Sequence, residues 1–224
     1  MSSALTSTQR VIFLQTDKTV ALETIPLDKP GPGQVLIKNT AVAQNPSDSS
    51  VGQYAIQLTH IAGYKVITTA SPKHHALVKS LIAAVAVDYR APDVVEQIIA
   101  ASGRGGIDFV HSERMDARKI ALVIPLDVTN LDQTVDYHLV MPGAFLDYEF
   151  VLAGEYFPRN KALLNLAFDL FDNAAGWFRG GRLKPNPVTV RPRGLSGIPA
   201  GLKFMKAGKV SRTKLVYRVA DTPA

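Results

Sequence analysis

The stretch that decides the fold runs Ser49-Ser50-Val51-Gly52-Gln53-Tyr54-Ala55-Ile56-Gln57-Leu58 and continues as Gly63-Tyr64-Lys65-Val66-Ile67-Thr68-Thr69-Ala70-Ser71-Pro72-Lys73. Its apolar residues from Val51 onward recur at helical spacing, which predicts a helix that Gly63 ends. The run from Tyr64 to Ala70 is rich in β-branched residues and predicts a strand. Serines before a helix, followed by a strand, are typical of the phosphate-binding turn, first helix and second strand of a nucleotide-binding βαβ unit.

The strand that such a unit needs before its helix is missing from the sequence. Asn45-Pro46-Ser47-Asp48 stands where an apolar strand and a glycine-rich turn are expected. The only apolar run close upstream is Val35 to Val42. Our hypothesis is that this run takes the place of the missing strand in a parallel sheet.

Downstream, strands and helices alternate. Pro72 opens a second helix with Ser71 as its N-cap. Val85 to Tyr89 reads as a strand, and Asp93 to Ala101 as a helix that turns Val94, Val95, Ile98 and Ile99 inward. Strands are also predicted at Ile107 to Val110 and Ile120 to Ile124. The alternation predicts an α/β fold with a parallel sheet covered by helices.

Further strands are predicted before and after this alternating segment. Strands are expected at 11–14, 20–24, 135–140, 148–152, 187–190 and 214–219, with a short helix at 198–206. A long amphipathic helix is predicted from Lys161 to Phe178, ended by Gly180-Gly181. Its apolar face is expected to hold Leu163, Leu164, Ala167, Leu170, Phe171, Ala174 and Trp177 or Phe178.

Composition limits the function classes. The 224 residues include no cysteine, which excludes disulfides, thiolate metal sites and cysteine nucleophiles. No signal-peptide pattern and no long apolar run is present, so we expect a cytoplasmic protein without a membrane partner.

The formal net charge of +6 is unevenly distributed. Residues 179–218 hold eleven Lys or Arg and no Asp or Glu. This block either attracts a phosphorylated ligand or forms a solvated lysine-rich face. No aromatic platform accompanies the charge, so nucleic acid is not an expected partner.

Two groups of residues suit a dinucleotide. Backbone N–H groups of Ser49, Ser50, Val51 and Gly52, at a helix N-terminus, favour a pyrophosphate, although a simple serine-capped helix explains them too. Ser71, Pro72, Lys73 and His74 follow the second strand, where such folds bind the adenosine ribose. The turn offers hydroxyl, ammonium and imidazole groups and no acid, which favours the extra phosphate of NADPH over NAD. The alternative is a capped helix start with a solvated Lys73.

Five fragments of the sequence resemble segments of a known protein superfamily. "NTAVAQNPSD", "SSVGQYAIQLTHIAGYKVITTASPKHH", "VDYRAPDVVEQI", "GIDFV" and "GRLKPNPVTVRP…GLKFMKAGKVSRTKLVYRV" follow one another here as in the medium-chain dehydrogenase/reductase superfamily. The chain most resembles the zinc-free fungal branch of trans-acting enoyl reductases and quinone-reductase-like proteins. It departs from that branch at the Asp48/Ser49 join, near Ser112 to Ala117, and at Ile82, where relatives usually have glycine.

The resemblance implies an α/β fold with an incomplete Rossmann-type parallel sheet and a truncated GroES-like β N-terminal segment. Residues 1–48 would be the remnant of the GroES-like domain and residues 49–185 the NAD(P)-binding Rossmann-like domain. Residues 186–224 would return to the N-terminal β domain.

It also implies an activity, the transfer of hydride from NADPH to the activated C=C bond of a polyketide-type or other α,β-unsaturated carbonyl. The expected partner is a small-molecule substrate, and an acyl chain bound to a carrier protein is one candidate. The protein itself is expected to be a monomer or a dimer. The alternative is an inactive shortened paralogue or splice remnant that at most binds NADPH.

By resemblance, Tyr89 lies near the adenine or its phosphate, Ile124 and Pro125 on the nicotinamide side, and Val210 and Ser211 at a late cofactor contact. Gly154, Glu155, Tyr156 and Phe157 resemble a loop near the acyl substrate. An edge aromatic at Tyr89 and a plain turn at 154–157 are the alternatives.

No catalytic residue is named, because the basic residue of relatives falls in the missing segment. The five histidines lack ligand spacing, so no metal is expected.

Overall fold

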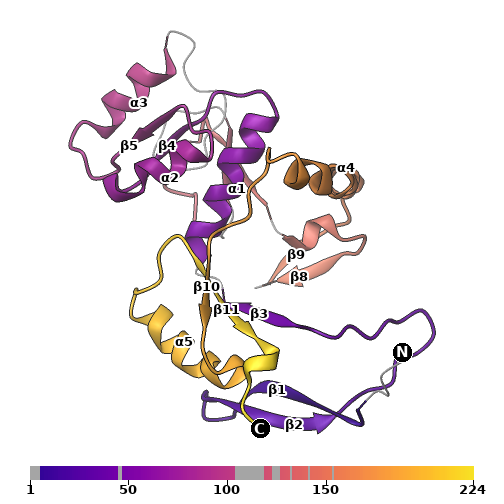
Figure 1. Ribbon diagram of the computed structural model, residues 1–224. Coiled ribbons are helices and arrows are strands. Elements are labelled where there is room, and N and C mark those ends of the chain that lie inside the picture. Colours follow the sequence, from indigo (N-terminus) through magenta and orange to yellow (C-terminus); the bar gives the residue numbers. More distant parts are fainter. Residues whose placement is uncertain are drawn as a thin grey trace. The chain divides into compact units, whose positions relative to one another are not determined.

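The computed structural model describes residues 6–44, 47–103, 119–122, 127–131, 133–140, 142–152 and 154–224. The contacts within the chain divide it into two units, one of residues 1–54 and 185–224 and one of residues 55–184. The sequence predicted divisions after residues 48 and 185. Figure 1 shows both units, with most of their helices and strands labelled.

The first unit begins with an antiparallel hairpin. Strand β1 (Thr8–Leu14) pairs with β2 (Val20–Pro26) over seven residue pairs. The turn closes through a bond from the Gln15 N–H to the Thr19 carbonyl at 2.8 Å. The sequence predicted strands at 11–14 and 20–24, which lie within β1 and β2.

A three-stranded sheet completes the first unit. Its order is β10 (Val188–Arg191), β11 (Lys214–Arg218), β3 (Ala41–Gln44). β10 and β11 run parallel, and η3 (Gly194–Gly197) and α5 (Ile198–Lys206) connect them; η4 (Val219–Asp221) follows β11. Tyr217 in β11 is fully buried, and its hydroxyl donates to Gln44 Oε1 at 2.8 Å.

The hypothesis that Val35 to Val42 replaces the missing strand is wrong. Residues 35–39 form no strand, and β3 pairs antiparallel with β11, with Val42 opposite Tyr217. This pairing lets Val42 pack on the cluster of Leu195, Ile198, Leu215 and Tyr217. Burial in that apolar cluster determines where the segment pairs.

The second unit contains the predicted helix–strand–helix–strand segment. Helix α1 (Ser47–Ile61) begins in the first unit and ends in the second. Strands β4 (Ile67–Thr69) and β5 (Val85–Val87) are parallel neighbours, connected by η1 (Pro72–His74) and α2 (His75–Ser80). The core between them holds Ile56, Val66, Val78, Leu81 and Ala83.

A buried amide fixes the end of this unit to α1. Gln57, 3% exposed, accepts from the Lys184 N–H at 2.7 Å and donates to the Lys184 carbonyl at 3.2 Å. The two bonds satisfy a side chain that would otherwise be costly to bury.

Helix α3 (Val94–Ser102) buries less than its sequence predicts. Ile98 is buried, but Val95 is 44% and Ile99 58% exposed. Successive helical residues point about 100° apart, so only one member of each apolar pair can face the core. The prediction that all four residues turn inward is therefore wrong.

The remaining described strands form separate pairs. β6 (Lys119–Leu122) is parallel to β7 (Asp136–Leu139), and Leu122 is buried against Val128 and Val135. β8 (Phe150–Leu152) and β9 (Glu155–Phe157) form an antiparallel hairpin after η2 (Pro142–Phe145). Within the second unit, the described parallel strands thus form two pairs, β4 with β5 and β6 with β7. Ile107 to Val110 lies outside the described residues.

Helix α4 (Lys161–Arg179) begins at Asn160, whose side-chain oxygen accepts from the N–H groups of Ala162 and Leu163 at 3.1 Å each. Ala167 is buried, as predicted, but Phe171 is 73% and Phe178 40% exposed. Placing Phe171 on the apolar face that packs inward is therefore wrong, and of the two alternatives Trp177 and Phe178 it is Trp177 that is half-buried. The apolar residues cover more of the helix circumference than one contact face can bury.

Four helices end in the same way, through the paired bonds of a Schellman motif. The left-handed residue after the helix is glycine in three of them, Gly63 after α1, Gly181 after α4 and Gly208 after α5. After α2 it is Ile82, at φ 72. There the Ile82 N–H donates to the Lys79 carbonyl at 3.0 Å and the Ala83 N–H to the Val78 carbonyl at 3.1 Å.

Among the helices that the structure describes, none combines the length and the apolar character needed to cross a bilayer.

Candidate functional site

The carboxyl ends of β4 and β5 bring two of the predicted residues together. Ser71 follows β4 and Tyr89 follows β5, and parallel strands end at the same edge of their sheet. A bond from the Ala70 N–H to the Val87 carbonyl, 2.9 Å long, extends the pairing to this edge. The Ser71 hydroxyl then donates to the Tyr89 hydroxyl at 3.3 Å.

The turn after β4 presents its polar groups beside this pair. Pro72 occupies the first position of η1, and Ser71 precedes it as the predicted N-cap with an extended backbone. The Ser71 side chain makes no capping bond, because its hydroxyl bonds to Tyr89 instead. Lys73 is exposed and His74 is half-buried in the same turn.

Arg90 is a member of this edge that sequence reasoning missed. Its guanidinium carbon lies 5.0 Å from the centre of the Tyr89 ring, within the range of a cation–π contact. The Arg90 N–H donates to Asp88 Oδ1 at 3.1 Å, which orders the loop after β5. The sequence feature that could have identified Arg90 is its position as a basic residue directly after Tyr89.

Two cations, Lys73 and Arg90, and one carboxylate, Asp88, belong to the residues that follow β4 and β5. The hydrogen bond with Ser71 lowers the pKa of the Tyr89 hydroxyl below its ordinary 10.0, and the charge of Arg90 lowers that pKa further. No Asp or Glu occurs from Val66 to Val87. The Ser71 and Tyr89 hydroxyls and the Arg90 guanidinium therefore lie together, with the exposed Lys73 two residues after Ser71, a donor set that suits a phosphate group.

The predicted pyrophosphate residues lie in helix α1. The helix begins at Ser47, so Ser49 and Ser50 lie in its first turn, and Val51 and Gly52 come after it. Only the first N–H groups of a helix lack a partner within it, so those of Val51 and Gly52 are used by the helix itself. The first helix therefore starts earlier than predicted; binding of a pyrophosphate there stays a prediction.

Val210 and Ser211 lie in the loop after α5, in the same unit as the start of α1. The buried Gln53 amide of α1 donates to the carbonyl of Arg212 at 3.4 Å. The structure therefore brings this loop beside α1, and Gln53 is a contact that sequence reasoning missed. Ile124 and Pro125 lie outside the described residues.

The predicted substrate loop is the turn and second strand of the β8–β9 hairpin. Gly154 adopts φ 85 in the turn, where a left-handed backbone favours glycine. Glu155 begins β9 opposite Leu152. Phe157 stacks on Phe150, with ring centres 4.9 Å apart.

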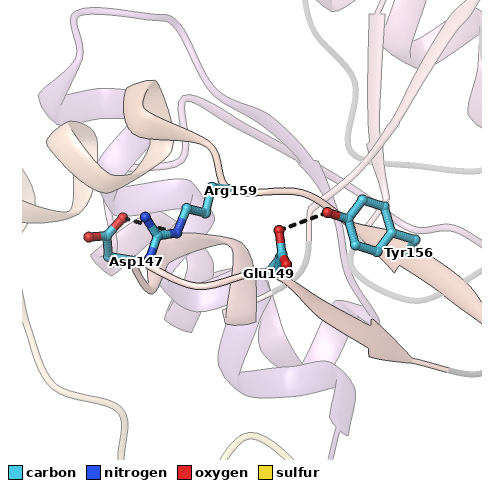
Figure 2. A network of polar contacts seen from close by, with 4 residues as sticks. All are labelled: Asp147, Glu149, Tyr156 and Arg159. Atoms are coloured by element: carbon cyan, nitrogen blue, oxygen red, sulfur yellow. Dashed lines mark hydrogen bonds and ion pairs between the residues drawn. The ribbon is translucent and has the colours of Figure 1, made fainter.

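Figure 2 shows the polar contacts of this hairpin. The Tyr156 hydroxyl points at Glu149 and donates to its Oε2 at 2.8 Å. Glu149 raises the pKa of Tyr156, because the bond and the negative charge favour the protonated hydroxyl. Beside them Arg159 Nε lies 3.9 Å from Asp147 Oδ1.

The described histidines are distributed over several elements. His138 pairs with Asp136 at 2.8 Å on β7, and His75 Nε2 lies 2.9 Å from the Ala70 carbonyl oxygen. Within the described ranges no three His, Asp or Glu side chains gather as a metal site would require. Zinc independence stays a prediction.

Comparison with known proteins gives relatives but no matching family profile. A zinc-type alcohol dehydrogenase-like protein of Schizosaccharomyces pombe is 30% identical over 191 residues, covering 76% of this chain and 53% of the relative. Trans-enoyl reductase tndF of Aspergillus flavipes is 31% identical over 185 residues, covering 76% and 51%. Trans-enoyl reductase mycC of Thermothelomyces thermophilus is 28% identical over 225 residues, covering 86% and 58%. The chain spans about half the length of these relatives.

Solved structures agree on the fold. The CurK enoyl reductase matches with a TM-score of 0.50 and 20% identity, over 75% of this chain and 51% of that one. The CurF ER cyclopropanase matches with a TM-score of 0.50 and 16% identity, over 75% and 50%. The predicted α/β class, with a shortened Rossmann-type sheet and GroES-like segment, is confirmed. The predicted resemblance to the medium-chain dehydrogenase/reductase superfamily is confirmed, because the homologues of the chain are zinc-type alcohol dehydrogenase-like proteins and fungal trans-enoyl reductases.

Proposed function

We propose that the chain is an NADPH-dependent oxidoreductase that reduces the activated C=C bond of an α,β-unsaturated carbonyl. Similarity to zinc-type alcohol dehydrogenase-like proteins and trans-enoyl reductases supports the reaction class. The observation that supports the cofactor is the Ser71–Tyr89 edge, with Lys73 and Arg90 beside it.

This donor set fits the 2′-phosphate that distinguishes NADPH from NADH. Folds of this kind hold the adenosine ribose after the second strand, and an acid there binds the free 2′-hydroxyl of NAD. Here the turn after β4 has no acid, and the Asp88 carboxylate in the loop after β5 accepts the Arg90 N–H. Ser71 and Tyr89 would hold phosphate oxygens through their hydroxyls, and Lys73 and Arg90 through charge-assisted bonds.

When bound, NADPH supplies the hydride, and the protein has to orient the substrate beside it. The β8–β9 hairpin supports an apolar substrate, because Val151 is 67% and Tyr156 57% exposed on it. We infer that the substrate is an acyl compound, with a carrier-bound acyl chain as one form.

Calorimetric titration with NADPH and NADH at one salt concentration tests the cofactor. We expect NADPH to bind more tightly than NADH, because only NADPH carries the extra phosphate. Lys73→Glu should weaken NADPH binding by about tenfold or more while leaving NADH binding nearly unchanged. The matched control is Lys161→Glu on α4, an exposed lysine that should change neither affinity.

Equal affinities for the two cofactors, or no binding at millimolar NADPH, would contradict the cofactor assignment. The reaction itself is tested by the loss of NADPH absorbance with an α,β-unsaturated acyl thioester. Binding of NADPH without turnover would support the inactive alternative.

A further inference from the structure

A pocket of ≈ 510 Å³ lies at the amino ends of β4 and β5, at the edge opposite to Ser71 and Tyr89. Val66, just before β4, and Ala84, just before β5, line it. The Ala84 N–H donates to the Val66 carbonyl at 2.9 Å, so the backbone here is fixed. The pocket is shallow and largely open to solvent, so a ligand in it would remain partly exposed.

The pocket is apolar where it meets the core. Val66 and Ala83 are buried members of the core cluster. Tyr64 and Ile82 line the pocket with side chains that are 47% and 48% exposed. An apolar ligand could cover both side chains while resting against the core.

Ile82, in the lining of the pocket, has a left-handed backbone conformation that isoleucine disfavours. A β-branched residue at φ 72 is a steric outlier, and this chain uses glycine at the same position after α1, α4 and α5. Because the Ile82 side chain is half-exposed, it contributes little apolar burial to the core. Backbone strain that is tolerated without a packing reason is characteristic of functional sites.

The rim of the pocket is basic. His60, Lys65 and Lys79 line it, and no acidic residue does. The Lys65 ammonium donates to the Ala101 carbonyl at 2.7 Å, which fixes its position and uses one of its three donors. Charge complementarity therefore favours an anion.

We propose that this pocket binds a small organic anion with an apolar body, of the medium-chain carboxylate class. The carboxylate would lie at Lys65 and Lys79, and the hydrocarbon would cover Ile82 and Tyr64. This site is separate from the cofactor edge and does not depend on the proposed function. A different role for the cations, neutralising the carboxyl ends of α1, α2 and α3, would predict no ligand.

Octanoate, followed by chemical-shift changes of the full chain, tests the proposal, with uncharged octanamide as the matched ligand. We expect saturable shifts around Val66 and Ala84 and about tenfold weaker binding of octanamide. Lys79→Gln should weaken octanoate binding by a similar factor. Lys203→Gln, at the equivalent last turn of α5, should leave it unchanged.

Two substitutions of Ile82 separate binding from folding. Ile82→Gly relieves the strained backbone and Ile82→Ala keeps it, yet both remove the side chain that covers the ligand. Both should weaken octanoate binding while their melting temperatures differ. Absence of saturable binding, or binding that survives both Ile82→Gly and Lys79→Gln, would overturn the proposal, whatever the outcome with NADPH.

Discussion

At the scale of single residues, Ile82 is the clearest conflict between side chain and backbone. A left-handed conformation costs an L-residue about 1–2 kcal/mol, and glycine avoids this cost. Among the four Schellman motifs that the structure describes, only the one after α2 accepts this cost, while Gly63, Gly181 and Gly208 avoid it in the others.

We expect Ile82→Gly to be more stable than Ile82→Ala by about 1 kcal/mol, because both remove the side chain and only alanine retains the strain. Denaturant unfolding of the two variants measures the difference. Gly63→Ala provides the reverse control, since a Cβ there meets no neighbour and only φ 92 opposes it. Equal stabilities of the two Ile82 variants would show that no strain is stored.

The Ser71–Tyr89 bond makes a prediction about pH. Ser71→Ala should raise the pKa of Tyr89 toward its ordinary 10.0, because the bond from Ser71 is the main cause of its lowering. Folding favours the tyrosinate, so this stabilisation is present above pH 10.0 and is lost as the pH falls through the lowered pKa. Tyrosinate absorbance, with Tyr89→Phe as the reference, measures the shift; an unchanged titration would contradict the bond.

At the scale of elements, two helix glycines have opposite surroundings. Gly176 in α4 has open space where a Cβ would point. A Cβ at Gly201 in α5 would collide with the Tyr217 hydroxyl and Gln44 Oε1. The first glycine weakens its helix, whereas the second lets α5 approach the sheet.

The same substitution should therefore act in opposite directions. Gly176→Ala should stabilise the protein by about 1 kcal/mol through helix propensity. Gly201→Ala should destabilise it by about 1–3 kcal/mol through overpacking at Tyr217. Chemical denaturation of both variants checks the signs, and a stabilising Gly201→Ala would contradict the packing of α5 on β11.

Local features explain which elements the sequence predicts well. The helix at 198–206 has the predicted bounds, and Gly63 and Gly180-Gly181 end their helices as expected, since caps and stops depend on a few neighbouring residues. The faces of α3 and α4 were partly wrong, because apolar residues on two sides of a helix leave the buried side to tertiary packing. Arg90 was missed because its stacking on Tyr89 requires the geometry of the loop.

At the scale of the whole chain, charge is divided between the units. Residues 1–54 and 185–224 hold twelve Lys and Arg against five Asp and Glu, a formal net charge of +7. Residues 55–184 have a formal net charge of −1. Self-repulsion should destabilise the first unit, and salt should screen it.

We therefore expect the melting temperature to rise as sodium chloride increases from low to physiological concentration. Replacing Lys206 and Lys209 together by Gln should reduce this dependence, because both are exposed in the basic block. Calorimetric scans across a salt series measure it. A melting temperature that falls with salt in this range would show that attractive pairs outweigh the repulsion.

Pairing between distant segments explains the largest error in the predicted fold. Val35 to Val42 has the apolar character of an internal strand, yet β3 pairs with β11, about 170 residues later in the chain. Periodicity does not encode such a partner, because the choice depends on where Tyr217 and Leu215 are buried.

The brevity of β4 and β5 has a consequence for ligand exchange. Three residues of strand extend only about 10 Å, comparable to the distance over which dissolved ions screen charge at 0.1 M ionic strength. Anions held at the two ends of this strand pair would therefore repel each other. A carboxylate at one end should promote cofactor release from the other, most visibly in dilute buffer, and by reciprocity the cofactor should expel the carboxylate equally.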